Sequence, residues 1–261
     1  MKKLLVVITI AAVAAASLAA DAVNQKPRRR PPKGRGGRAS GGIVEKAYTG
    51  KVFRILNAQT DYAGEPLMKL TKDIRHTALL PIECVQGEVP AGKCPFDVAE
   101  QLVATTNVGA GVIVVNDAKL PILTIAPDRR WGILNVTPAK ADNPTPEKFA
   151  KRFNKLYWNV IARTLGAGTS SYPGCVLTPF SDMSQLDAIA ATQPCPEPFN
   201  KMIDTGKKYG IGIISIASYR MACEKGWAAA PTNDVQKAIW DEVHAVPKNP
   251  MKIEFDPKKG R

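Results

Sequence analysis

Residues 145–166, TPEKFAKRFNKLYWNVIARTLG, encode the element around which the fold is organised. Thr145 is a good N-cap, Pro146 suits the first helical turn, and Glu147 complements the positive end of the helix dipole. Gly166 can end the helix in a left-handed turn. Apolar side chains recur every three to five residues, at Phe149, Phe153, Leu156, Val160 and Leu165. The pattern predicts a long amphipathic helix with one continuous apolar face.

Shorter apolar segments surround this helix and predict a sheet with further helices. Strands are expected at 51–56, 78–84, 111–115, 121–126 and 131–137, and helices at 66–75, 95–104, 197–208 and 235–246. Residues 211–216 fit either state, and the region up to 195 after the main helix is rich in loop-forming residues. The expected fold class is α/β: a mixed, twisted sheet backed by helices, with a long central helix and a loop-rich C-terminal lobe.

The N-terminus has the layout of a secretory signal peptide, predicted at 1–22. Two lysines precede an uncharged, mostly apolar run at 4–16, and small residues follow it. An uncleaved membrane anchor is the alternative for this segment. No other stretch is apolar for long enough to cross a bilayer, so we expect no transmembrane span in the mature chain. The expected location is extracytoplasmic, either periplasmic or secreted.

A basic linker rich in Pro, Gly and Arg is predicted at 23–49, ahead of a folded domain at 50–261. Its cations are Lys26, Arg28, Arg29, Arg30, Lys33, Arg35 and Arg38. The linker offers little to bury, so its composition predicts a disordered arm. The arm is either a solubilising spacer or a segment that binds polyanions, such as an anionic envelope polymer, in a salt-sensitive way.

Several familiar catalytic patterns are absent from the sequence. Gly166 and Gly168 follow a helix instead of a strand, so they do not form a nucleotide-binding loop. The two histidines, His76 and His244, are far apart and are better explained as surface or packed residues. Five cysteines in an exported chain favour disulfides with one thiol left over, although buried cysteines also act as small apolar residues.

Residues 159–195, NVIARTLGAGTSSYPGCVLTPFSDMSQLDAIAATQPC, carry a resemblance to a known family. They resemble the core of the archaemetzincins, zinc peptidases of the metzincin clan, whose motif is HExxHxxGxxHC followed by CxM and CxxC. The agreement in letters and spacing is at Thr164, Leu165, Gly166, Pro173, Cys175, Val176, Phe180 and Ser181. Leu177 replaces the family methionine. The resemblance covers about 79–202 and implies a metzincin-like fold.

The departures from that motif affect the catalytic site. By the resemblance, Asn159, Arg163 and Thr169 occupy the three zinc-ligand positions, and Val160 occupies that of the general base. A catalytic zinc needs three protein ligands, a valine cannot take a proton, and arginine repels a cation. The expectation is therefore no catalytic residue, no metal and no cofactor. Asn159 and Arg163 are four apart on a helix, so both should point the same way, with Arg163 held by Asn159 or a nearby acid, or reaching solvent.

The resemblance also implies a pairing of cysteines. The family's second zinc site uses four cysteines, of which Cys175 and Cys195 remain, while the other two positions hold Ser170 and Pro198. In an oxidising compartment, the two remaining thiols are expected to form a disulfide. Cys84 and Cys94 are candidates for a second disulfide, which would leave Cys223 over.

The resemblance and its departures imply a non-catalytic pseudopeptidase. Such a protein would bind a peptide or protein by strand addition in the former substrate cleft. Two alternatives stay open. One is an active extracytoplasmic zinc metallopeptidase with atypical ligands, and the other is a surface or polyanion-attachment protein that acts through its basic arm.

Overall fold

The computed structural model describes residues 41–245. The strands are β1 (Ile43–Glu45), β2 (Val52–Asn57), β3 (Ile82–Gln86), β4 (Val108–Val115), β5 (Leu123–Ala126), β6 (Trp131–Asn135) and β7 (Ile216–Ser218). The helices are α1 (Glu65–Ala78), α2 (Pro95–Val103), α3 (Pro146–Thr164), α4 (Met183–Ala188), α5 (Pro196–Lys208), α6 (Tyr219–Glu224) and α7 (Asp234–Ala245), with short 3-10 helices η1 (Pro127–Arg129) and η2 (Pro138–Lys140). The predicted signal peptide and the cations of the basic arm lie outside the described residues.

The main sheet has five strands in the order β3-β2-β4-β6-β5. The first four are mutually parallel, whereas β5 runs antiparallel to β6 at one edge. A separate pair is formed by β1 and β7. The mixed α/β architecture expected from the sequence is confirmed.

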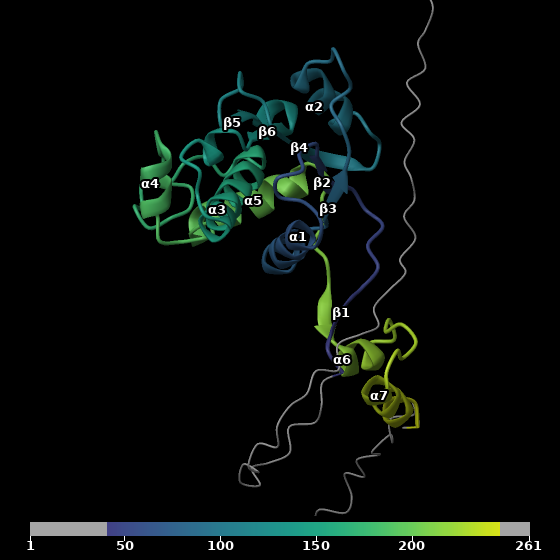
Figure 1. The fold of residues 1–261 in the computed structure, drawn as a ribbon. Helices are drawn as coiled ribbons and strands as arrows, with labels where there is room; N and C mark the ends of the chain where they lie inside the picture. Colours follow the sequence, from purple (N-terminus) through teal and green to yellow (C-terminus); the bar gives the residue numbers. More distant parts are fainter. Residues whose placement is uncertain (1–40, 246–261) are drawn as a thin grey trace, which may run out of the picture. The chain divides into compact units, whose positions relative to one another are not determined.

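Helices cover both faces of this sheet (Figure 1). Every residue of β4 is buried, and its alternate side chains belong to different cores. Val112 and Val114 face the core shared with α1 and α3, and Ile113 and Val115 face the core shared with α2. A parallel sheet covered in this way explains the continuous apolar run of β4.

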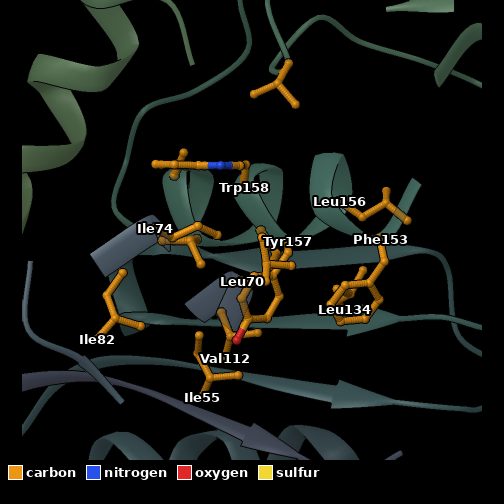
Figure 2. Close-up of a cluster of buried hydrophobic side chains, with 14 of the residues drawn as sticks. Ile55, Leu70, Ile74, Ile82, Val112, Leu134, Phe153, Leu156, Tyr157 and Trp158 are labelled. Carbon is orange, nitrogen blue, oxygen red and sulfur yellow. The ribbon is translucent and has the colours of Figure 1, made fainter. Parts of the chain in front are cut away.

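The helix predicted from residues 145–166 is α3, and it forms the centre of the larger core (Figure 2). The Thr145 hydroxyl accepts a hydrogen bond from the Lys148 backbone N–H at 3.3 Å, as expected for an N-cap. Phe153, Leu156 and Tyr157 are fully buried. The Tyr157 hydroxyl is 3.0 Å from that of Thr71 on α1, so its polar end has a partner inside the core.

A glycine in β6 allows α3 to approach the sheet closely. A Cβ on Gly132 would overlap the Thr164 hydroxyl and would lie 3.2 Å from Val160 Cγ2. The same Cβ would lie 3.4 Å from Ile125 Cδ1 of β5. The end of α3 is therefore seated directly on β6, beside the edge strand.

Several boundaries differ from the expected ones. Within residues 41–245, β1 lies inside the segment expected to be linker up to residue 49. The expected strand at 78–84 starts only at β3, because α1 continues to Ala78 and ends with Leu79 in a left-handed conformation. Residues 211–216 form neither a full strand nor a helix: Ile211 makes an isolated bridge to Lys51, and β7 begins at Ile216.

The segment after α3 is rich in loops, as expected, and its helices α4 and α6 are short. Further along, α6 and α7 share a small core of Tyr219, Cys223 and Ile239. Among residues 41–245, no helix is both long enough and apolar enough to cross a membrane.

We expect Gly132→Ala to lower the free energy of unfolding by about 1–3 kcal/mol, because the new methyl group must displace the Thr164 hydroxyl. Thr164→Ala should relieve most of this loss in the double variant, since the Thr164 hydroxyl has no hydrogen-bond partner to lose. Urea unfolding of the two single variants and the double variant measures the coupling.

Gly206→Ala on α5 is the matched control, because its Cβ would meet Leu80 Cδ2 at an ordinary 3.6 Å. It should be neutral or stabilising by up to about 1 kcal/mol. Equal losses in Gly132→Ala with and without Thr164→Ala would contradict the proposed close approach.

Candidate functional site

One face of α3 carries polar side chains toward the segment that follows it. Arg152, Asn159 and Arg163 are spaced seven and four residues apart, so they lie on the same side of the helix. We call these three residues, together with Lys155, the polar face of α3. Arg152, Lys155 and Asn159 are buried, and Arg163 is half-buried.

Arg152 is 1% exposed and is the most fully paired member of the polar face. Its Nε donates to Asp187 Oδ1 at 2.8 Å, and one Nη donates to Asp142 Oδ2 at 2.9 Å. Lys148 bridges the same two carboxylates at 3.1 and 3.3 Å. The hydrogen bonds from Arg152 outweigh burial and hold the pKa of Asp142 and Asp187 below the usual aspartate range.

An open hollow of about 590 Å³ lies over this ion cluster. Its lining includes Arg152, Asp142, Lys148, Met183 and Asp187. Arg152, Lys148, Asp142 and Asp187 are already paired with one another, so they serve to attach α4 and the turn after η2 to α3. Lys155 contributes to the same attachment, because its Nζ donates to the backbone oxygens of Leu186 and Asp187 at 2.9 and 3.1 Å.

The positions expected to match the first zinc ligand and the general base are both packed. Asn159 is 2% exposed, and its Nδ2 donates to the backbone oxygen of Val176 at 2.9 Å. Its Oδ1 is buried and has no hydrogen-bond partner. Val160 is fully buried and faces Gly132 of β6. The amide therefore holds the loop after α3, and the valine forms part of the interface with the sheet.

The two remaining ligand positions behave differently. Arg163 is half-buried, and its guanidinium makes no hydrogen bond or ion pair with any residue in 41–245. Burial lowers the pKa of its guanidinium. The expectation that Asn159 or a nearby acid holds Arg163 is therefore wrong, since Asn159 donates to Val176 instead. Thr169 is exposed beyond the end of the helix.

Three of the four positions expected to match the family's second metal site converge in space. The sulfurs of Cys175 and Cys195 lie 2.7 Å apart, and Cys195 N–H donates to Cys175 Sγ at 3.2 Å. Ser170 Oγ is 3.4 Å from Cys195 Sγ. Pro198 is in the first turn of α5, which begins directly after Cys195.

The two thiols are free in this structure and have different acidities. Burial raises the pKa of Cys175, but hydrogen bonds from the Cys195 thiol and backbone outweigh it, so its pKa is lowered. The pKa of Cys195 is raised, first by burial and then by its bond to Cys175. Cys175 is therefore the more readily formed thiolate of the pair.

Cys84 and Cys94 are also free thiols, so the disulfide suggested for them is not present. Cys84 belongs to β3, where burial raises the pKa of its thiol beside the hydroxyls of Tyr157 and Thr71. Cys94 is exposed at the residue before α2. Cys223 is buried in the small core of α6 and α7.

The histidines occupy structural positions, as expected. His76 Nε2 lies 3.6 Å from Glu45 Oε2, and the His244 ring stacks on Trp240. Between residues 41 and 245 there is no group of three or more His, Cys, Asp or Glu side chains arranged to hold a metal ion.

Strand β5 presents an open edge next to α3, which sequence reasoning did not single out. Asn135 N–H donates to the Ile122 oxygen at 2.9 Å, and the register continues by pairing Thr124 with Ile133. Because hydrogen-bonded pairs alternate in an antiparallel ladder, Leu123 and Ile125 direct their N–H and C=O groups away from β6. Their side chains pack on the core shared with α3.

The open edge of β5 has the chemistry of a strand-addition site. In residues 41–245, no backbone hydrogen bond outside the β5–β6 ladder involves Leu123 or Ile125. Such a row of unpaired groups is a template for an extended chain. An antiparallel strand at the end of an otherwise parallel sheet is the signal that points to this edge.

The sheet and the helices on its two faces define an α/β protein, and α3 carries the polar face. No protein-family model matches the sequence, and no curated protein matches it. The crystal structure of archaemetzincin from Methanopyrus kandleri is similar at 13% identity and a TM-score of 0.45, covering 60% of this chain and 96% of its own. A zinc-dependent peptidase from Methanocorpusculum labreanum (strain Z) is similar at 11% identity and a TM-score of 0.47, covering 57% and 99%. The likeness is one of fold alone.

The paired carboxylates predict sensitivity to acid. Asp142 and Asp187 have lowered pKa values in the folded state, so their contribution to stability is complete above the unfolded value of about 3.9 and is lost as the pH falls below it. Asp187→Asn should lower the free energy of unfolding at pH 7 and flatten its decline below about pH 5. Urea titrations from neutral pH to pH 3 measure both effects.

Asp241→Asn is the matched control, because Asp241 pairs with Lys237 on the exposed surface of α7. It should change stability by less than about 1 kcal/mol. If Asp187→Asn leaves the acid dependence as steep as in the wild type, the Arg152 cluster is not its source.

Mild oxidation should join Cys175 to Cys195, because the two sulfurs are already adjacent and Cys175 has the lowered pKa. The bond closes a loop of about 20 residues and should stabilise the fold by about 3 kcal/mol. Non-reducing peptide mapping after treatment with oxidised glutathione identifies the product.

Cys94→Ser is the control and should leave this product unchanged, since Cys94 is exposed elsewhere. Recovery of unmodified Cys175 and Cys195 after exhaustive oxidation, or of either of them bonded to another cysteine, would refute the assignment.

Proposed function

We propose that this is an exported, non-catalytic protein that binds an extended peptide along β5, beside the polar face of α3. The observation that carries the proposal is the state of Asn159 and Val160. By the resemblance these positions belong to a zinc ligand and the general base, yet here they bind a loop carbonyl and pack on the sheet. Neither an amide donating its N–H nor a valine can activate water.

The unpaired edge of β5 supports peptide binding without catalysis as the function of the site. Leu123 and Ile125 present outward N–H and C=O groups, and α3 packs against both β5 and β6. Backbone pairing supplies affinity for an extended chain with little demand on its sequence. The strand is also half-buried along its whole length, which limits competition from water.

Experiments distinguish this proposal from two other functions, zinc peptidase activity and attachment through the basic arm. An active zinc peptidase with atypical ligands would contain metal and would cleave peptides in a chelator-sensitive way. Attachment through the basic arm depends on Lys26 to Arg38, which lie outside the described residues. Export likewise rests on the predicted signal peptide at 1–22.

The purified protein should contain less than about 0.1 zinc per chain and cleave no member of a peptide library, because three protein ligands are needed for a catalytic zinc. Elemental analysis and mass spectrometry of the digest measure both quantities, with and without added zinc. One zinc per chain together with cleavage abolished by a chelator would replace the proposal with an active peptidase.

Ile125→Pro should weaken peptide binding at least about tenfold, because proline removes the outward N–H of β5 while leaving the β6-facing groups intact. Ile125→Ala is the matched control: it removes the same apolar side chain but keeps the N–H, and it should bind nearly as the wild type does. Fluorescence anisotropy with labelled peptides gives the dissociation constants. Equal affinities for the two variants would show that β5 is not the docking edge.

A further inference from the structure

The members of the polar face of α3 differ in one respect. Arg152 is held by the carboxylates of Asp142 and Asp187. Lys155 is held by two backbone oxygens of α4, and Asn159 by the backbone oxygen of Val176. Arg163, at the C-terminal end of the same face, has no hydrogen-bond or ion-pair partner within residues 41–245. Arg163 is thus the cation of this face whose charged group has neither an ion pair nor a hydrogen bond within residues 41–245.

Arg163 belongs to the last turn of α3, the helix that packs against β5 and β6. The next residue, Thr164, contacts Gly132 of β6, and Gly132 pairs directly with Ile125 of β5. A peptide added to β5 would therefore run alongside the end of α3. One turn earlier on the same face, Asn159 Oδ1 is buried without a partner, so a second polar atom here also lacks one.

The physical chemistry of a half-buried guanidinium favours an anionic partner. Partial burial removes part of its hydration, which is reflected in its lowered pKa, and no carboxylate within residues 41–245 offsets that loss. A carboxylate can accept two parallel N–H bonds from arginine in a fixed planar arrangement. Such a bond is stronger where water is partly excluded.

We propose that Arg163 determines the specificity of the β5 site by binding a carboxylate of the incoming peptide. The inference rests on the proposed peptide-binding function and names the class of peptide: an extended segment with an acidic group placed beside the end of α3. The carboxylate belongs either to an aspartate or glutamate side chain or to the C-terminus of the peptide, and the test separates these two sources.

The test uses labelled, N-acetylated peptides of about ten residues built on an alternating Thr and Val pattern, long enough to pair along the edge. Each peptide carries either one Glu or one Gln, and the position of this residue is varied along the peptide. Peptides with an amidated C-terminus are compared with peptides that end in a free carboxylate. Dissociation constants are measured by anisotropy for the purified wild type, Arg163→Gln, Arg163→Lys and Lys151→Gln. Lys151 is an exposed cation of the same helix and serves as the matched control.

The wild type and Lys151→Gln should bind the best Glu peptide, or the free acid, about tenfold more tightly than its neutral twin. Arg163→Gln should remove this preference without weakening the Gln peptide, and Arg163→Lys should keep only part of it, because lysine lacks the planar fork. Thermal unfolding of each variant establishes that it is folded.

The outcomes separate the two claims. Equal binding of Glu and Gln peptides by the wild type, or a preference that survives in Arg163→Gln, overturns the role of Arg163 while leaving peptide binding in place. Failure of every peptide to bind the wild type overturns both the proposed function and this inference.

Discussion

The close approach of α3 to β6 is the contact on which the rest of the structure depends. It exists because Gly132 has no side chain, so Val160 and Thr164 can rest on the backbone of the sheet. The apolar residues of α3 then fill the space between this contact and α1. Because protein interiors are close-packed, a helix displaced here would lose contacts along its whole length. The position of the polar face follows from the same contact, since the two faces belong to one rigid helix.

The polar face solves a different problem, which is how to attach a loop-rich segment with little apolar surface. Residues 166–195 contain one short helix, so most of their backbone groups need partners outside regular structure. Lys155 and Asn159 provide such partners for three carbonyls, and Arg152 binds α4 through Asp187. Buried charges of this kind contribute little net stability, but removing one partner is costly because the other is left unpaired. The cluster therefore fixes the arrangement of the segment more than it adds to its stability.

The sequence predicted those features that depend on local periodicity. The start of α3 followed from Thr145 and Pro146, and its apolar stripe placed Val160 correctly in the core. Features that depend on distant partners were not predictable in the same way. Strand β1 has three residues and pairs with β7 far along the chain, and α4 and α6 have six residues each, too few for a periodic signal.

In the candidate site, too, the features set by local spacing were predictable and those set by distant partners were not. Helical spacing correctly placed Asn159 and Arg163 on one face, but the partner of Asn159 is set by the path of the loop that carries Val176, which no local pattern encodes. The resemblance placed Cys175 and Cys195 close together, and their sulfurs lie 2.7 Å apart, while the disulfide expected between them stays a prediction. It gave no basis for Cys84 and Cys94, where only their number and proximity in sequence suggested a bond.

The residues that stand, by the resemblance, at the first ligand and general-base positions have structural roles in α3. A helix that supplies imidazoles to a metal must leave them free of other contacts and open to a water molecule. Here Asn159 donates a hydrogen bond to the backbone of the neighbouring loop, and Val160 beside it packs against the sheet. These two contacts stabilise the fold at the place where a catalytic site would require polar groups without protein partners. Arg163 is the exception, since it is neither packed like Val160 nor paired like Arg152. A charge that the protein leaves half-buried and unneutralised is most readily explained by a partner that is not part of the described chain, and the open edge of β5 lies where such a partner would arrive.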